Sequence, residues 1–362
     1  MSPNTTLQEL QSIIVNNISE GIWAPGERIP SERQLAQAYN VTRTAVRKAI
    51  ASLTEQGVLV AIPGSGTYVS TKAQKAASSK TIAFLVCSRG KPDYTVTTNL
   101  FYAQVLRGVE LAARRMNYQC IVSTIDELER DYGSLDDILN KVDGLVLGEL
   151  RCQRLHDHIV RSRYPTTLIS PSLHSPVLDT IKIDSYSGSL NAVDYLVSLG
   201  HKRIAFVGGS KDSHPAQERL AGYKAGLKKN GLEISERLIR ISGWDFAAAR
   251  EAVRDLVARE QFTAILAASD YLAFAALQVL REHNLRVPDD VSVIGFDDLE
   301  VAAHQSPPLT SVRVHKEELG KLAVTMLLTR LEDERTVGTV TVVPCKLIVR
   351  ESCRPVDDLG CR

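Results

Sequence analysis

Arg43 and Arg47 lie one helical turn apart near the start of the segment TRTAVRKAIASL. In a helix this segment would bury one apolar stripe, made of Val46, Ala49, Ile50 and Leu53. Thr44 and Arg47 would then point away from the stripe. Arg43 would lie at its edge in the first turn, the part of a recognition helix that enters the major groove first. Because guanidinium groups there suit guanine O6/N7 edges and phosphates, the pattern predicts a helix that reads DNA.

Two further helices are predicted to position these arginines. The nearer one begins at Ser31, which forms a capping box with Gln34. After a tight turn, Thr42 caps the helix that carries the arginines. The first helix is predicted over residues 7–20, and its apolar positions recur with a helical period at Leu7, Leu10, Ile14 and Ile18.

Residues 58–69, VLVAIPGSGTYV, predict a hairpin that carries Gly64, Ser65 and Gly66. Its glycines would let the backbone come close to a duplex, at a phosphate or in the minor groove. Any one of these arginines could instead be an ordinary solvated residue on a small helical domain. The order of capping box, turn, basic helix and glycine hairpin within residues 25–69 favours DNA binding.

Residues 5–70 closely resemble the winged-helix domain of the GntR family of bacterial repressors. The family pattern pG-x-x-(L/I)-PSER-x-LA, then (V/T)-(S/T)-R-x-(T/A)-V-R, then G-x-GT-(F/Y)-V, is met almost position for position. This resemblance implies that DNA contacts come from Arg33, Arg43, Thr44, Arg47 and the hairpin residues Gly64, Ser65 and Gly66. It also implies that Thr42 reaches a phosphate.

The longer C-terminal part holds side chains of the kinds that bind carbohydrate. A sugar presents vicinal hydroxyls and an apolar ring face, so its site needs planar hydrogen-bonding groups and an aromatic platform. Asp270 and Asp297 follow predicted strands at their carboxyl ends, where open α/β sheets bind ligands. Arg219 supplies a guanidinium group. Phe246 supplies an aromatic ring, with Trp244 as the weaker choice.

These residues also have structural interpretations. Arg219 could form an ion pair at a helix start with Asp212 or Glu218. Asp297 and Asp298 could cap the segment that follows them. The residues alone leave both alternatives open.

Near-continuous apolar runs alternate with amphipathic segments from residue 81 to about 315. Such runs are typical of parallel sheets buried on both faces by helices. About 280 residues exceed what one open sheet holds, so we expect an α/β fold with two parallel-sheet subdomains and a cleft between them. The tail over 339–352 is predicted to close the second sheet. The strand candidates span 81–87, 120–125, 144–148, 166–170, 203–209, 264–269 and 291–296.

The motifs LGHKRIAF, RLAGY and PDDVSVIGFDD resemble the sugar-responsive core of LacI/GalR repressors, which is similar to periplasmic sugar-binding proteins. The likeness covers about residues 81–355. It implies that Arg219, Asp297 and the aromatic residue near 246 contact a small effector. A LacI-type DNA-binding head and hinge helix are absent, and the GntR-type head in their place resembles the arabinose-repressor type.

The first subdomain's half of the effector site is less marked in the sequence. Asn99, Phe101 and Tyr102 follow the first strand, where ligands of this family bind, and Tyr102 is the effector-contact candidate. The loop over 88–99 departs from the family's common pattern.

The predicted organisation has three parts. A winged-helix domain spans 1–70, a small polar linker spans 71–80, and the effector-binding and dimerisation domain spans 81–362. The chain is expected to cross between the two subdomains near 184, 297–310 and 325.

Composition fits a globular intracellular protein. The chain has 362 residues, 44% of them hydrophobic and 23% charged, and its net charge of +1 means that DNA affinity must come from local clustering of charge. No signal peptide or run of 18 apolar residues is evident, so we expect a cytoplasmic protein with no membrane partner.

No metal or cofactor is predicted. The six cysteines form no CxxC pair, which is typical of isolated thiols in a reducing compartment. Cys152, His156 and His158 lie close together but lack the spacing of a zinc site.

Together these features predict a homodimeric transcription factor that represses carbohydrate-utilisation genes. A palindromic DNA operator and a small sugar, either a monosaccharide or a sugar phosphate, are its expected partners. An activator with the same architecture is the first alternative. A sugar-processing enzyme with a DNA-binding module is a remote one, because no nucleophile–base pair, metal set or nucleotide loop supports it.

Overall fold

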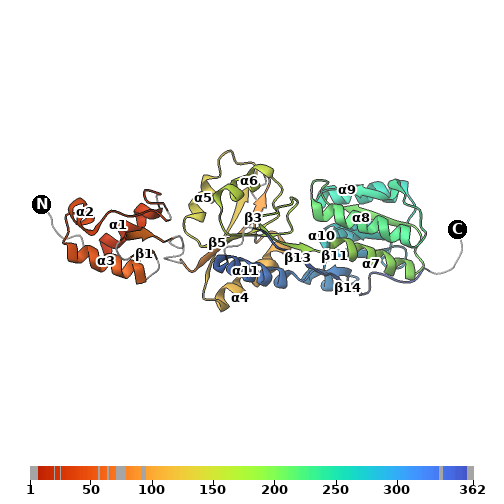
Figure 1. The fold of residues 1–362 in the computed structure, drawn as a ribbon. Helices are drawn as coiled ribbons and strands as arrows, with labels where there is room; N and C mark the ends of the chain where they lie inside the picture. Colours follow the sequence, from red (N-terminus) through yellow and green to blue (C-terminus); the bar gives the residue numbers. More distant parts are fainter. Residues whose placement is uncertain are drawn as a thin grey trace. The chain divides into compact units, whose positions relative to one another are not determined.

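The computed structural model describes residues 7–19, 21–24, 26–55, 58–62, 65–70, 79–90, 95–333 and 337–356. The chain divides into two compact units, Met1–Ser79 and Lys80–Arg362 (Figure 1). Most of the linker predicted over 71–80 lies outside the described residues. Within the described part, no helix is long and apolar enough to cross a membrane.

The N-terminal unit is a three-helix domain with a two-stranded wing. Its apolar core takes Leu10 and Ile14 from the first helix and the predicted stripe from the third. The capping box at Ser31 and Gln34 is present, which confirms the predicted start of the second helix. Its elements are α1 (Leu7–Ser19), α2 (Glu32–Ala38), α3 (Arg43–Glu55), β1 (Leu59–Ile62) and β2 (Gly66–Val69).

The C-terminal unit contains two six-stranded sheets, each covered by helices on both faces, as predicted from the apolar strands. The first sheet has the order β13-β7-β6-β5-β3-β4, and all its pairs are parallel. Its strands are β3 (Thr81–Ser88), β4 (Gln119–Asp126), β5 (Gly144–Gly148), β6 (Thr166–Ile169), β7 (Asp179–Ile183) and β13 (Val340–Val343). Its helices are α4 (Leu100–Arg115) and α11 (Lys316–Glu332) on one face and α5 (Gly133–Leu139) and α6 (Gln153–Ser162) on the other.

The second sheet has the order β14-β12-β11-β10-β8-β9, and only the β12–β14 pair is antiparallel. Its strands are β8 (Ile204–Gly208), β9 (Ile239–Ile241), β10 (Ala264–Ala267), β11 (Ser292–Asp297), β12 (Thr310–Arg313) and β14 (Lys346–Ile348). Its helices are α7 (Ser185–Ser198) with α8 (His214–Lys229), and α9 (Phe246–Arg259) with α10 (Asp270–Glu282). The described part of the unit also contains the 3₁₀ turns Glu236–Leu238 and Glu300–His304.

The chain passes between the two sheets at three places. The first is at Asp184, between β7 and α7. The second is between β12 and α11, at about residues 314–315, and the third is at residues 344–345, between β13 and β14. The crossings expected at 297–310 and 325 are therefore corrected. Residue 325 lies inside α11, and the segment after β11 stays with the second sheet because β12 pairs beside β11.

The strand-rich tail supplies one strand to each sheet, whereas the sequence predicts that it closes the second sheet alone. Its first strand, β13, pairs with β7 of the first sheet, and its second, β14, pairs with β12 of the second. Only Pro344, which is exposed, and Cys345, which is half-buried, separate the two strands, so these two residues lie where the chain passes from one sheet to the other. The tail thus ties the subdomains together.

Candidate functional site: a basic helix and two sheet edges

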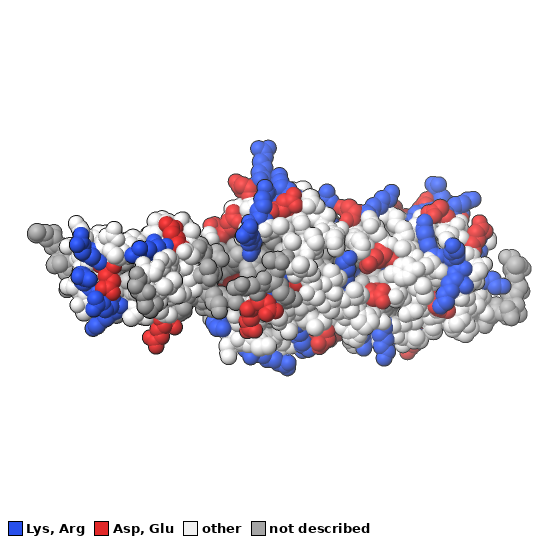
Figure 2. Space-filling view, viewed as in Figure 1, with Lys and Arg blue, Asp and Glu red and all other residues white. Residues whose placement is uncertain are grey.

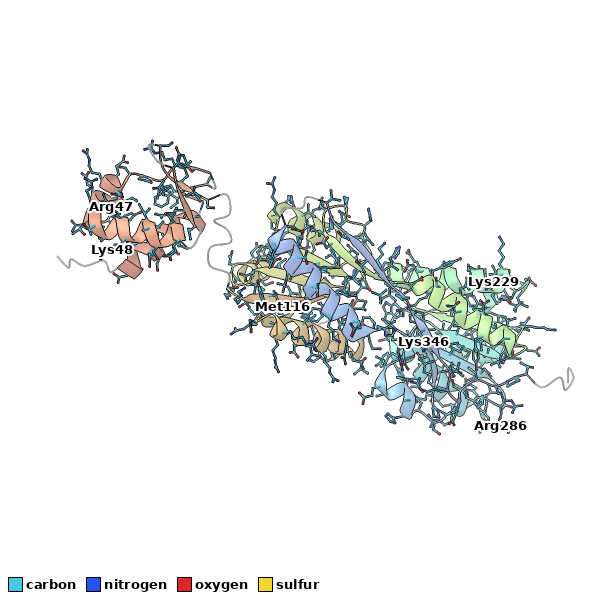
Figure 3. All side chains as sticks on the ribbon, turned by 60° about the horizontal axis from the view of Figure 1, so that its bottom comes forward. Arg47, Lys48, Met116, Lys229, Arg286 and Lys346 are labelled. Atoms are coloured by element: carbon cyan, nitrogen blue, oxygen red, sulfur yellow. The ribbon has the colours of Figure 1, made fainter. Side chains whose placement is uncertain are left out.

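The third helix presents a polar, basic face opposite its buried stripe. Val46, Ala49 and Leu53 are buried, whereas Arg43, Thr44 and Arg47 are exposed on the other side. Lys48 lies beside Arg47 and is exposed as well (Figure 3). Blue side chains are visible on this unit in the space-filling view (Figure 2). The geometry leaves these side chains accessible to a duplex.

An acidic residue of the neighbouring helix holds the basic face in place. Arg47 donates from Nε and Nη2 to the carboxylate of Glu32, at 3.1 and 2.9 Å, and Arg43 Nη2 lies 4.0 Å from the same carboxylate. The hydrogen bond from Arg47 is the main cause that lowers the pKa of Glu32. Glu32 therefore orients Arg47 before any DNA is bound.

Thr42, one of the predicted phosphate contacts, also caps the third helix. The amide of Ala45 donates to Oγ1 of Thr42 at 3.2 Å, which confirms Thr42 as the helix cap. A hydroxyl both donates and accepts, so Thr42 keeps its own proton for a phosphate. Arg33 lies exposed in the first turn of the preceding helix.

The wing is described on both strands but not at every predicted contact. Gly64 lies outside the described residues. Ser65 Oγ lies 2.6 Å from Tyr68 Oη, and Gly66 has a φ of +139°, a conformation that favours glycine. Ser65 and Gly66, the two predicted wing contacts that are described, thus lie at the turn end of the hairpin.

In the C-terminal unit, Arg219 and Asp297 meet as the sequence suggested. Arg219 is 4% exposed, and its guanidinium donates from Nη2 to Asp297 Oδ1 at 3.3 Å and from Nη1 to the carbonyl of Ala268. It stacks 3.8 Å from the ring centre of Phe296, while its Nε has no hydrogen-bond partner among the described residues. The alternative ion pair with Asp212 or Glu218 is not the one that forms.

Asp297 lies in an unusual stretch of backbone at the end of β11. Its φ is +107° and that of Asp298 is +51°, both uncommon for residues with side chains. Burial raises the pKa of Asp297, and the positive charges of Arg219 and Lys316 oppose that rise. Lys316 donates from Nζ to the carbonyls of Asp297 and Asp298. The stretch is held by its neighbours, as strained functional loops are.

Asp270 has a structural role in this geometry, in place of the predicted effector contact. Its carboxylate is 0% exposed and accepts hydrogen bonds from Leu299 N at 2.6 Å and Ser311 Oγ at 2.5 Å. Both oxygens are therefore engaged inside the domain, where they fix the segment that follows Asp297. Burial, followed by the charge of Asp297, raises the pKa of Asp270 to about 8.

The two aromatic candidates differ in their surroundings. The Phe246 ring packs against Tyr271, with 5.1 Å between ring centres. The Trp244 ring lies 5.7 Å from the Arg219 guanidinium and directly on Gly209, where an added Cβ would be 2.4 Å from the ring. The structure therefore places Trp244, the weaker choice from sequence, beside Arg219.

In the first subdomain, Tyr102 lies at the carboxyl end of β5. Its ring rests on Gly148, where a Cβ would be 2.5 Å from the ring, and it is 5% exposed. Asn99 accepts from the amides of Phe101 and Tyr102 at 3.0 and 3.1 Å, so it caps α4. These contacts give Asn99 a local structural role.

The contacts between the carboxyl edges of the two sheets include two that sequence reasoning missed. Arg89, which directly follows β3, forms an ion pair with Asp212, which follows β8. The amide of His214 donates to Ser172 Oγ at 3.1 Å. Arg89 carried a usable signal, since it stands at the carboxyl end of the first strand in the loop that departs from the family pattern.

Within the described residues, no group of three or more potential metal ligands is assembled. His156 and His158 have protein partners of their own. Nδ1 of His156 lies 3.1 Å from Asp157, and Nε2 of His158 lies 2.8 Å from Asp136.

A winged helix-turn-helix head joined to a two-sheet, periplasmic-binding-protein-like unit defines the class of ligand-responsive transcriptional regulators. Residues 6–69 match the bacterial regulatory proteins of the gntR family, and residues 193–353 match the periplasmic binding protein-like domain. The chain is 34% identical to the ribose operon repressor of Escherichia coli over 245 residues, which are 66% of this chain and 73% of that repressor.

Two further relatives extend along nearly the whole chain. The arabinose metabolism transcriptional repressor of Geobacillus stearothermophilus is 27% identical, covering 96% of this chain and 97% of the relative. The structure of the transcriptional regulator CelR in complex with cellobiose superposes with a TM-score of 0.70 at 28% identity, over 90% of this chain and 100% of that one. The chain belongs to the family of bacterial transcriptional repressors that includes the ribose operon repressor.

Proposed function

We propose that this protein represses carbohydrate-utilisation genes from a palindromic operator and that a small sugar releases it. The exposed Arg43, Thr44 and Arg47 on a helix whose opposite face is buried carry the DNA-binding part of the proposal. Arg33, Thr42 and the wing residues Ser65 and Gly66 complete the contact surface, as the GntR-type resemblance implies. Arg43 and Arg47 reach base edges, and the others position the head on the phosphate backbone.

The effector binds at the carboxyl edges of the two sheets. Arg219 has a buried Nε without a described partner, and Asp297, Trp244 and Phe296 surround its guanidinium. A charged fork beside aromatic rings suits the hydroxyls and apolar face of a sugar. The cellobiose bound to CelR and the names of the ribose and arabinose repressors support a carbohydrate, either a monosaccharide or a sugar phosphate.

The effector acts on DNA binding through the two subdomains. The two subdomains are in equilibrium between an arrangement closed around the effector and an open one. The effector shifts this equilibrium only as far as its affinities for the two arrangements differ. In a homodimer this shift changes the spacing of two DNA-binding heads, which a palindromic operator reads. We assign no catalytic role to any residue, in line with relatives that are named as regulators.

The test begins with the selection of a duplex from a random library by the wild-type protein. Arg43→Ala should weaken binding to the selected duplex by about 1–3 kcal/mol and reduce discrimination against random DNA. Arg286→Ala, an exposed position on the C-terminal unit (Figure 3), is the matched control and should bind as wild type does. Undiminished discrimination by Arg43→Ala would refute the base-reading role.

The effector is found by a thermal-shift screen against monosaccharides and their phosphates. A sugar that raises the melting temperature should also release the selected duplex, and Arg219→Met should abolish both responses while unliganded DNA binding persists. If no carbohydrate stabilises the protein, the effector assignment is wrong. A turnover assay with each stabilising sugar separates binding from catalysis.

A further inference from the structure

The segment that precedes the second helix is part of the wing. Gly26 N donates to Val69 O at 2.9 Å, Val69 N donates to Glu27 O at 2.8 Å, and Ile29 N donates to Thr67 O at 2.9 Å. Arg28 is paired with Tyr68 in an antiparallel bridge. Residues 26–29 thus lie antiparallel beside β2 through an isolated bridge, and these backbone hydrogen bonds fix where Arg28 stands.

Alternation of side chains at this bridge sends Arg28 outward. Ile29, the next residue, is 2% exposed and lies in the core, so the neighbouring Arg28 side chain points to the opposite, solvent side. The pairing with β2 then places its guanidinium beside the wing.

The guanidinium of Arg28 lies directly on Gly66. A Cβ at Gly66 would stand 2.5 Å from Nε, 3.0 Å from Cζ and 3.1 Å from Nη2 of Arg28. Any side chain at this position would displace the guanidinium. The second wing glycine therefore provides room for an arginine of the same chain, which the sequence alone does not indicate.

Arg28 also differs from the recognition-helix arginines in its charge environment. Among the described residues no carboxylate lies within 4.0 Å of the Arg28 or Arg33 guanidinium, whereas Arg43 and Arg47 both face Glu32. Arg28 and Arg33 line the same hollow at the start of the second helix. Glu27, which also borders it, accepts a hydrogen bond from Ala24 N at 2.8 Å instead.

We propose that Arg28 is a further DNA contact, which binds a backbone phosphate beside the wing and uses Gly66 as its seat. An exposed guanidinium without a described acidic partner, fixed by backbone hydrogen bonds, is suited to a phosphate because its planar fork matches the phosphate oxygens. Arg28 positions the head on the duplex and carries no sequence preference. This inference rests on the proposed DNA-binding function.

The experiment measures the salt dependence of binding for the full-length protein, with the selected duplex and a random duplex of equal length as probes. One lost phosphate contact lowers the slope of log Kobs against log salt by about 0.9. Arg28→Gln should therefore lose about 0.9 per protomer and weaken binding to both duplexes alike. The affinity ratio of wild type to variant should shrink by about 3.5-fold for each protomer bound, and so by roughly twelvefold for a dimer, between about 50 and 200 mM salt.

Three companion variants keep the test specific. Arg28→Lys retains the charge and should retain the slope. If Arg28 had a purely structural role, the slope would not depend on whether its replacement is charged. Gly66→Ala keeps Arg28, but its methyl group fills the space that the guanidinium occupies. It should therefore lower the slope as Arg28→Gln does. Because alanine is strained at this φ, its thermal unfolding is measured alongside. Lys229→Gln, on α8 of the other unit (Figure 3), should leave the slope unchanged.

The outcomes separate this inference from the proposed function. If Arg43→Ala loses discrimination while folded Arg28→Gln keeps the wild-type slope, Arg28 is not a phosphate contact and the inference is overturned. If Arg43→Ala also binds and discriminates as wild type does, DNA reading by this head fails and the Arg28 inference fails with it. A lowered slope for Arg28→Gln together with a retained slope for Arg28→Lys supports the inference.

Discussion

Charge and burial conflict at several single residues beside the second sheet. Asp270 and Asp297 are both buried, and Lys316 is buried against the carbonyls of the Asp297 stretch. Desolvation lowers the pKa of Lys316 and raises that of both carboxyls. Such a cluster persists only when each group has hydrogen-bond partners, and here each has them. The cluster fixes the loop that presents Asp297 to Arg219.

Asp270 should make the stability of the protein depend on pH. Its pKa is about 8 in the folded chain, above the value of about 4 in an unfolded one. A raised carboxyl pKa gives stability that is present at low pH and lost as the pH rises through this window, by up to about 1.4 kcal/mol per pH unit. Asp270→Asn should flatten that decline between pH 5 and 8 in urea unfolding.

The control for this prediction is Asp131→Asn, at an exposed position of the first subdomain. It should leave the wild-type pH profile unchanged. An Asp270→Asn profile as steep as that of the wild type would show that Asp270 does not titrate in this window.

At the scale of elements, α2 and α3 act as one DNA-reading piece because Glu32 joins them. Removing its charge with Glu32→Gln leaves Arg47 free and unoriented. We expect tighter binding to random duplexes and a specificity ratio lower by roughly fivefold, about 1 kcal/mol, as for a well-placed exposed ion pair. Fluorescence anisotropy with the selected and random duplexes measures both. A specificity ratio equal to that of the wild type would mean that Glu32 does not orient Arg47.

A second element-scale feature is the close crossing of α4 and α11. A Cβ at Gly320 would lie 2.2 Å from the carbonyl oxygen of Val105, and one at Gly108 would lie 2.0 Å from that of Glu317. The two helices approach backbone to backbone, which only glycine allows at both points. The chain crosses from the second sheet to the first just before α11. The contact with α4 therefore fixes the helix that begins directly after this crossing.

Gly320→Ala should lower the free energy of unfolding by about 1–3 kcal/mol, because the added methyl group must push two helices apart. Gly133→Ala is the matched control, since the nearest atom to a Cβ there is 3.9 Å away. Urea unfolding at neutral pH compares the two. A cost for Gly320→Ala no larger than that for Gly133→Ala would contradict the close-packing explanation.

At the scale of the whole molecule, the C-terminal unit is a pair of sheets joined by three chain crossings and by contacts at their carboxyl edges. The Arg89–Asp212 ion pair is such a contact, and its side chains are 53% and 44% exposed. An exposed pair contributes little stability, but it exists only while the edges are close. It therefore favours the arrangement that encloses a bound effector.

Breaking this pair should weaken effector binding modestly, by roughly twofold to fivefold. Arg89→Gln and Asp212→Asn should have the same effect, and the double variant should be no weaker than either. Calorimetric titration with the sugar found by thermal shift gives the three affinities. Additive losses in the double variant would show that the two side chains act separately.

The DNA-reading helix could be predicted from the sequence because its signals are local. The stripe from Val46 to Leu53 and the capping box at Ser31 depend on residues three or four positions apart, and helical geometry alone brings these together. The apolar strands and their alternation with helices predicted the two-sheet architecture in the same way. Arg219 and Asp297 were placed in one site by family resemblance and not by spacing.

Only the tertiary structure decided which distant groups share an environment. It joined Arg219 to Asp297 across 78 positions, withdrew Asp270 into the interior, and sent the two strands of the tail to different sheets. It also set Arg28 on Gly66. Local periodicity determines which elements form, whereas burial and hydrogen-bond satisfaction, which depend on chain segments far apart in sequence, determine which side chains meet.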